Sequence, residues 1–418
     1  MKLWQKISIS TAIGLVVGAI LPSNGGDTLG FLKILSDILI SLGTYVLVPL
    51  VFVQVITSSY ELRQDRTGNR FLLRTLFFVV GSALALSLLG GLCVVIFSPE
   101  RIPIGIEEAT IPEMPSLSKL LQVVFSGNSL QALSNPSGLL VAVFVFALIV
   151  GLASYSQKTV ARPLIDFSES ASKVLYHINR TIVEILLYCS VVLAATRLLT
   201  IRETQNLDLY LQITLLIGIL CLLIVFVAYP LIIYLFDRRH KPFLWIRQLV
   251  PSMITGFLTG SSLLPLGFLM RSGNEELGLQ RRVWQWYYPL ATIVGRAGTA
   301  LVSTVAFLLI LHSHSRAEIT LQQFAGVVFS STFISFILGS VPGTGVLVSL
   351  SMMSSWYGSG IEKGFLILEP AAPILASFSV FLDLATQSFI AYMLDLMSSK
   401  DSVEEKKPSK FRDEFTIG

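Results

Sequence analysis

The residue with the clearest chemistry stands inside a long apolar run. The stretch Thr292–Ala300 reads TIVGRAGTA and lies within a run that extends from Trp284 to Leu311, with Arg296 near the middle. A charge at the centre of a membrane span costs about 2.5–3.5 kcal/mol even on lenient insertion scales, so it needs a partner. A guanidinium at this depth either holds the carboxylate of a ligand through two parallel hydrogen bonds or pairs with an acidic residue of the protein.

Two further apolar runs are interrupted by small polar residues. The run 245–270 contains Thr-Gly-Ser-Ser at its centre, and the run 324–357 contains Gly-Ser-Val-Pro-Gly-Thr-Gly. Small residues let backbone amides approach a ligand, and the positive end of a half-length helix favours an anion. Close packing of helices through small residues is the alternative explanation. The candidate substrate-binding residues of these two tips are Ser261, Ser262, Val341, Gly343, Thr344 and Gly345.

One acidic residue lies as deep as Arg296. Asp383 stands inside the last apolar run, Phe365–Leu394. The first hypothesis is that Arg296 and Asp383 form a charge pair in the place of a bound cation. The competing hypothesis is that Arg296 holds the carboxylate of the cargo. The two roles are compatible if they belong to different stages of a cycle.

The composition identifies the elements that must position these residues. Of the 418 residues, 53% are hydrophobic and 13% are charged, which is about half the charged fraction of a typical soluble domain. The chain is therefore expected to be a polytopic protein whose main partner is the lipid bilayer. We found no phosphate-binding loop, no nucleophile elbow, no metal-ligand cluster and no basic stripe suited to nucleic acid. An enzyme, a metal site and a nucleic-acid partner are accordingly not expected.

The apolar runs and the charges of the loops predict a topology. A helix needs about 20 apolar residues to cross the hydrocarbon core. Lys and Arg gather at the amino terminus and in alternate loops, so both termini are expected in the cytoplasm and the protein in the cell (inner) membrane. The predicted spans are Ile7–Leu21, Leu32–Thr57, Leu72–Phe97, Gly138–Tyr155, Val174–Leu199, Leu209–Phe236, Val283–Leu311 and Phe365–Leu394.

The two interrupted runs fit this topology only as re-entrant helical hairpins. Both ends of the run 245–270 face the basic, cytoplasmic side, and both ends of the run 324–357 face the other side. Each hairpin is followed by one span, so the carboxyl third contains two units of opposite orientation. Inverted repeats of this kind, with irregular backbone near the midplane, are typical of secondary transporters. The predicted fold is all-α, with eight transmembrane helices and two re-entrant hairpins.

The arrangement resembles the dicarboxylate/amino acid:cation symporter family, which includes glutamate and aspartate carriers. Leu42–Phe52 is similar to the family's second helix and Asn128–Gly151 to its fourth, while Ser261–Pro265 and Val341–Gly345 are similar to its two hairpin tips. The resemblance implies a homotrimer with an elevator mechanism. Residues 1–245 would mainly form the scaffold, with the third and sixth helices as candidates to move with the transport domain. Residues 246–398 would form the transport core and residues 399–418 a polar cytoplasmic tail.

The seventh span departs from the family pattern. The family has Asn-Met-Asp-Gly-Thr, in which the Asn and the Asp bind sodium, where this chain has Gly295, Arg296, Ala297, Gly298 and Thr299. Both sodium-binding side chains are therefore replaced and a cation is added between them. The threonine that contacts the substrate in the family is retained as Thr299.

The eighth span departs as well. Asp383 matches the family's last sodium-binding aspartate. The positions that receive the substrate amino group and side-chain carboxylate in the family are Ala372 and Leu375 here, and a liganding Asn is replaced by Ser379. We therefore expect the cargo to differ from glutamate in at least one of these groups.

These observations predict a symporter-like secondary active transporter for a small organic solute, either an acidic amino acid or a dicarboxylate. No cofactor is expected other than a coupling ion, sodium or a proton, and sodium coupling is expected to be reduced or absent. The alternatives are a proton-coupled or uncoupled carrier or exchanger of another organic acid or a neutral amino acid, and an anion-leak channel.

Overall fold

The chain is an all-helical membrane protein. A computed structural model describes residues 2–21, 26–65, 67–97, 140–203, 207–236, 242–314, 320–338, 345–358 and 361–405. Every regular element in these ranges is a helix, and seven of the helical stretches are long and apolar enough to cross a membrane. The predicted fourth span corresponds to a shorter apolar helix, α7 (Leu140–Ser156).

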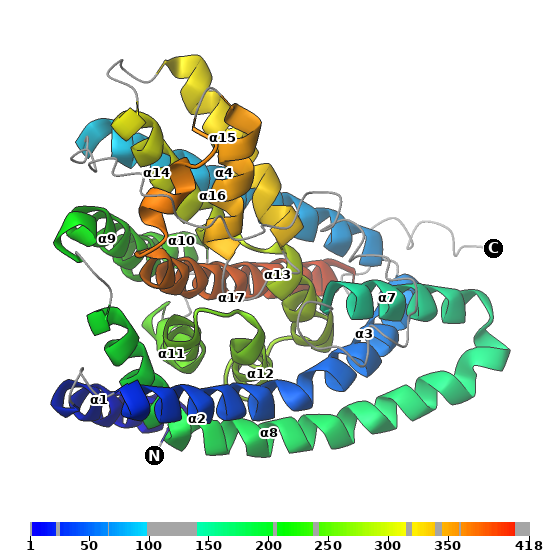
Figure 1. Cartoon of the computed structure of the whole chain (residues 1–418). Helices are drawn as coiled ribbons and strands as arrows, with labels where there is room; N and C mark the ends of the chain where they lie inside the picture. Colours follow the sequence, from blue (N-terminus) through cyan, green and yellow to red (C-terminus); the bar gives the residue numbers. More distant parts are fainter. Residues whose placement is uncertain are drawn as a thin grey trace, which may run out of the picture.

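Long helices of the first half form one side of the molecule (Figure 1). The longest is α8 (Lys158–Glu203), and α1 and α2 both pack along it. Helices α2 and α3 are separated at Val46, because Pro49 has no amide hydrogen to donate to the carbonyl of Tyr45. The bounds of the other helices in this half are α1 (Leu3–Ile20), α2 (Gly26–Tyr45), α3 (Leu47–Gln64) and α4 (Gly68–Phe97).

One predicted loop is helical instead. The basic stretch between the fourth and fifth predicted spans, with Lys158, Arg162 and Lys173, belongs to α8. The stretch contains no glycine and a single proline, Pro163, near the start of α8, and Lys173 pairs with Glu169 at 3.3 Å one turn away. A helix of 46 residues is roughly 70 Å long, so α8 extends well beyond a hydrocarbon core of about 30 Å.

The second half is arranged around one long helix, α17 (Ala372–Glu405), which crosses the middle of Figure 1. The hairpin of α11 and α12 lies on one side of α17, and the hairpin of α15 and α16 lies on the other. The two interrupted runs thus form paired half-length helices, as predicted. Their bounds are α11 (Pro242–Thr259), α12 (Leu263–Arg271), α15 (Leu321–Ile337) and α16 (Gly345–Tyr357).

The predicted seventh span is a helix in three pieces. It begins with a π-helical segment, η3 (Val283–Tyr287), continues as α13 (Tyr288–Val294), breaks at residues 295 and 296, and resumes as α14 (Ala297–His314). Pro289 lies in the first turn of α13, where a missing amide hydrogen is tolerated. The remaining elements are α9 (Leu207–Leu223), η1 (Ile224–Ala228), α10 (Tyr229–Phe236), η2 (Ser272–Glu276) and η5 (Gly364–Leu368).

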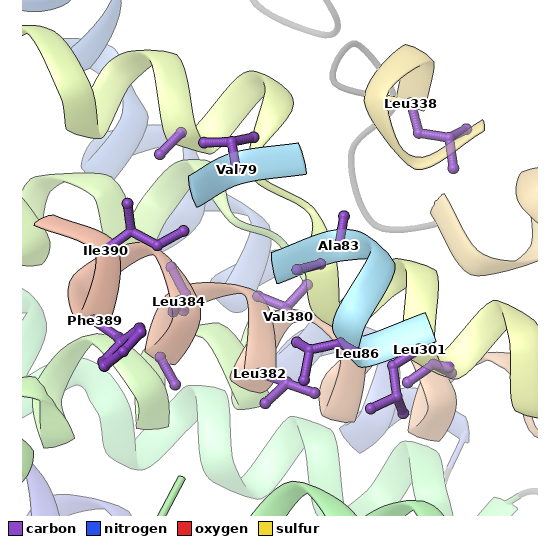
Figure 2. Packing of buried hydrophobic residues seen from close by; sticks show 14 of the residues in the cluster. Val79, Ala83, Leu86, Leu301, Leu338, Val380, Leu382, Leu384, Phe389 and Ile390 are labelled. Carbon is purple, nitrogen blue, oxygen red and sulfur yellow. The ribbon is translucent and has the colours of Figure 1, made fainter. Parts of the chain in front are cut away.

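Helix α4 packs on the second half of the chain rather than on the long helices of the first half. Figure 2 shows Val79, Ala83 and Leu86 of α4 in the same buried cluster as Leu301 of α14 and Val380 of α17. Burial of large aliphatic side chains contributes about 1.5–3 kcal/mol each. This apolar contact holds α14 and α17 in fixed register, and that register positions the polar groups at the break between α13 and α14.

Candidate functional site

Asp383 caps the start of α14 from a different helix. Its Oδ1 accepts hydrogen bonds from the backbone nitrogens of Gly298 at 2.7 Å and Thr299 at 3.0 Å, and its Oδ2 accepts one from the Thr299 hydroxyl at 2.7 Å. These amides belong to the second and third residues of α14, which a helix-capping side chain normally satisfies. The residue at the cap position is Arg296, which has no side-chain acceptor. Asp383 therefore supplies the missing cap.

Gln387 satisfies the other side of the break. Its Nε2 donates to the carbonyl oxygens of Ala291 at 3.0 Å and Gly295 at 3.1 Å, at the end of α13. Asp383 and Gln387 are four residues apart on α17, so they occupy one face of that helix. An acceptor meets the positive start of α14 and a donor meets the negative end of α13. We call this pair the α17 clamp; Gln387 was not singled out from the sequence.

The clamp depends on a close approach of α14 to α17. A Cβ atom added at Gly298 would lie 2.5 Å from the carbonyl oxygen of Ser379 and 2.7 Å from the backbone nitrogen of Asp383. No side chain fits in that space. Gly298 is therefore required for the amides of α14 to reach the Asp383 carboxylate.

The side chain of Arg296 extends toward the two hairpins. Its Nη2 donates to the hydroxyl of Ser262 at 3.4 Å, and Ser262 stands at the start of α12. A Cβ added at Gly345, the first residue of α16, would lie 3.1 Å from Nη1 of Arg296. Only 6% of Arg296 is exposed. A buried guanidinium thus lies between the amino-terminal ends of two half-length helices that come from opposite hairpins.

Arg296 and Asp383 are both buried at the break between α13 and α14. The hydrogen bonds of the carboxylate come from α14, and Arg296 is not among the donors. The two charges interact electrostatically over a longer distance. The geometry is consistent with a charge pair in which Arg296 and Asp383 attract each other electrostatically. The guanidinium itself is directed toward the hairpin ends.

The other predicted site residues have different surroundings. Ser261 lies at the tip of the first hairpin, where its Oγ accepts from the backbone nitrogen of Leu263 at 3.3 Å. The Ser379 hydroxyl donates to the carbonyl of Ala376 in its own helix, at 2.9 Å. Val341, Gly343 and Thr344, the rest of the predicted second tip, lie outside the described residues.

A second arginine reaches the first hairpin, and the sequence reasoning missed it. Arg197 of α8 donates to the carbonyl of Pro373 and to the hydroxyl of Ser377 at the start of α17, and the Ser377 hydroxyl donates to the carbonyl of Phe257 at 2.6 Å. A Cβ at Gly260 would be 3.6 Å from Arg197 Nη2. The available sequence signal was a charge near the end of an apolar run. Arg197 thus connects the long helix α8 to the start of α17, beside the first hairpin tip.

The broken helix, the opposed hairpins and the polar centre can now be compared with known families. The profile of the "Sodium:dicarboxylate symporter family" matches residues 3–396, nearly the whole chain. The chain belongs to this family. It is a family of membrane symporters rather than of enzymes, and its description names sodium and dicarboxylates.

Several curated proteins are similar to this chain at modest identity. "Excitatory amino acid transporter 4" of Mus musculus is 26% identical over 250 residues, which cover 59% of this chain and 42% of the relative. "Excitatory amino acid transporter" of Caenorhabditis elegans is 21% identical over 368 residues, covering 76% of this chain and 72% of the relative. The corresponding protein of Onchocerca volvulus is 22% identical over 371 residues. The chain thus spans less than half the length of the mouse relative.

Proposed function

We propose that this protein is a secondary active carrier for a small organic anion, either an acidic amino acid or a dicarboxylate. The supporting observation is the position of Arg296, which is 6% exposed and lies between the starts of α12 and α16. The amino-terminal end of a helix carries a partial positive charge. Two such ends and a guanidinium converge here, and an anion is the ligand that this set favours.

Each side chain would have a separate task. Arg296 would hold one carboxylate through two parallel hydrogen bonds. Backbone amides at Ser261 and Ser262 and at the predicted second tip, with Val341 and residues 343–345, would hold the other end of the cargo. Thr299 and Ser379 would line the space behind Arg296. The absence of a polar side chain at Ala372 favours a cargo that lacks an amine, and Arg296 would bind the carboxylate that Leu375 cannot.

We further propose that sodium coupling is reduced or absent. Sodium prefers a cage of oxygen ligands, and the resemblance locates two of its side-chain ligands at positions that are Gly295 and Ala297 here. The positive charge of Arg296 interacts with the negative charge of Asp383, the remaining acidic ligand position. Coupling to protons, or exchange of one anion for another, would then drive accumulation.

The quaternary structure and the movement are part of the same proposal. We propose a homotrimer in the inner membrane, with both termini in the cytoplasm, that works by an elevator mechanism. Residues 246–398 would form the moving core and residues 1–245 mainly the scaffold. The packing of α4 on α14 supports movement of the third helix with this core, and the exposed apolar side chains of α2, such as Phe31, Ile34 and Ile38, suit lipid or a neighbouring subunit.

Uptake by purified protein in liposomes tests the proposed activity. Radiolabelled aspartate, glutamate and succinate would be offered with and without a sodium gradient, and with a neutral amino acid as a comparison. We expect saturable uptake, independent of sodium, of at least one of these three solutes with two carboxylates. Flux that rises linearly without saturation would indicate an anion-leak channel instead, and uptake of the neutral amino acid alone would contradict the anionic cargo.

A further inference from the structure

The break between α13 and α14 is a place where a transporter usually needs a cation. The last carbonyl groups of a helix point away from the chain and carry partial negative charge. In transporters with discontinuous helices, such carbonyl groups coordinate the coupling sodium or proton. Here the carbonyl oxygens of Ala291 and Gly295 stand next to the carboxylate of Asp383, so the break gathers the oxygen atoms that a hard cation prefers.

All of these oxygen atoms already have donors from the protein. The two amide hydrogens of Gln387 go to the carbonyls of Ala291 and Gly295, one to each. The amides of Gly298 and Thr299 and the Thr299 hydroxyl go to Asp383. Gln387 and Asp383 are both 0% exposed, so water does not compete for these bonds.

The orientation of the Gln387 amide follows from its neighbours. If the amide were turned over, its oxygen would face two carbonyl oxygens, which is electrostatically unfavourable. With nitrogen toward the carbonyls, Gln387 Oε1 is buried without a hydrogen-bond donor among the described residues. An unsatisfied buried oxygen destabilises the folded state. The protein accepts this cost only if the two bonds made by the nitrogen stabilise the break by more.

We propose that the amide nitrogen of Gln387 occupies the place of a coupling cation and thereby makes the break independent of sodium. This inference deepens the proposed function, because it assigns the loss of sodium coupling to a particular residue. Gln387 supplies the donors at the carbonyl end, the start of α14 supplies them at Asp383, and Arg296 supplies the compensating positive charge nearby. Gln387 is thus a positioning residue that determines ion coupling.

Replacement of the donor by an acceptor tests this role. In Gln387→Glu the volume is kept, while two amide hydrogens are replaced by a carboxylate that faces two carbonyl oxygens. The thermal midpoint of the purified full-length protein would be measured above neutral pH in sodium chloride and in choline chloride at equal ionic strength. We expect Gln387→Glu to be several degrees less stable than the unmodified protein in choline, and to be restabilised saturably by sodium through mass action. The unmodified protein should show no difference between the two salts.

Gln54→Glu is the matched control. Gln54 is also 0% exposed, and its side-chain amide makes no hydrogen bond within the described part of the chain, so it holds no helix end. The control should lose stability equally in both salts. If Gln387→Glu does not fold, Gln387→Ala replaces it, because it also removes the side-chain donor from both carbonyl oxygens, of which Ala291 keeps only the backbone amide of Gly295, and should gain the same sodium response.

Two results would overturn the inference. One is a saturable, sodium-specific stabilisation of the unmodified protein, which would make Gln387 a ligand rather than a substitute for the ion. The other is a Gln387 variant that responds to sodium no more than the Gln54→Glu control. Because the measurement contains no cargo, a failure of the uptake assay leaves it unaffected. Conversely, transport could be demonstrated even if Gln387 proved irrelevant to sodium.

Discussion

Two interruptions of helical backbone meet near the centre of this protein, and they are closed in different ways. At the α13–α14 break, the start of α14 is capped by Asp383 and the end of α13 by Gln387. At the first hairpin tip, the start of α12 has no side-chain cap from Ser262, whose hydroxyl instead accepts from Arg296 at 3.4 Å. Both starts are amino-terminal ends of helices, but only the first has a carboxylate.

The difference separates a structural role from a binding role. The amides of α14 are satisfied by a buried carboxylate, so a ligand would gain little by competing for them. The start of α12 and the guanidinium of Arg296 present positive charge that a ligand can use. The break therefore holds the site in a fixed geometry, and the hairpin tip with Arg296 is the part that binds the cargo.

The largest effect is expected from removal of the cap at the break. Asp383→Ala leaves two buried amides and one hydroxyl without an acceptor, and we expect the free energy of unfolding to fall by about 2–4 kcal/mol. Thermal or denaturant unfolding in detergent measures this. Asp395→Ala is the control, because Asp395 accepts from a single backbone amide, that of Gln280 at 2.8 Å. Equal losses for the two variants would contradict a special role for the clamp.

A change at Arg296 should affect cargo binding as well as stability. Arg296→Gln removes the charge that faces the hairpin ends, and loss of a charge-assisted hydrogen bond of about 1.5–3 kcal/mol predicts roughly 10- to 100-fold weaker cargo binding. Stability should fall as well, because the buried carboxylate of Asp383 loses its compensating positive charge. Affinity would be measured by titration of the cargo identified in the uptake assay.

The matched control for this variant is Arg271→Gln. Arg271 is also 6% exposed, but it pairs with Glu275 at 3.1 Å at the far end of α12. Its replacement should lower stability. Cargo affinity should stay within a factor of about three, because Arg271 lies at the end of α12 that is remote from the hairpin tip. If both arginine variants bound cargo equally well, Arg296 would not be the anion receptor.

The apolar architecture could be predicted from the sequence because its signals are local. The spans follow from the lengths of the apolar runs, and the hairpins follow from clusters such as Gly260–Ser262 at their centres. The described residues confirm seven stretches long and apolar enough to cross a membrane, and paired half-length helices in both interrupted runs. The loop predicted at residues 158–173 was wrong, because charge and polarity indicated a loop where a stretch without glycine, with an ion pair between Glu169 and Lys173, belongs to α8.

The polar centre could be predicted only in part. Arg296 and Asp383 were identified because charges are rare in apolar runs. Gln387 was not, because an uncharged residue at helical spacing has no special signal until its partners are known. The bonds of the clamp join residues 85 and 92 positions apart, and only the packing of α14 on α17 brings them together. The assignments of Ser261, Ser262 and Arg296 to the cargo remain predictions.

A glycine at each interruption provides the finest test of the contrast. At the break, Gly298→Ala adds a Cβ 2.5 Å from the carbonyl oxygen of Ser379, and we expect overpacking to lower stability by about 1–3 kcal/mol. At the tip, Gly260 has a φ of +64°, but a Cβ there would meet nothing closer than 3.6 Å. The only cost of Gly260→Ala is the left-handed backbone, about 1 kcal/mol.

The two variants should also differ in what they do to binding. Gly298→Ala displaces α14 from α17 and should reduce stability and cargo affinity together, because Arg296 directly precedes α14 and would be displaced with it. Gly260→Ala leaves the clamp intact and should affect mainly the tip, with a small loss of stability and a change confined to cargo affinity or rate. Unfolding midpoints and uptake kinetics measured side by side would reveal this. If Gly260→Ala destabilised the protein as much as Gly298→Ala, the tip would be as rigid a part of the structure as the break. The distinction between a structural break and a binding tip would then be wrong.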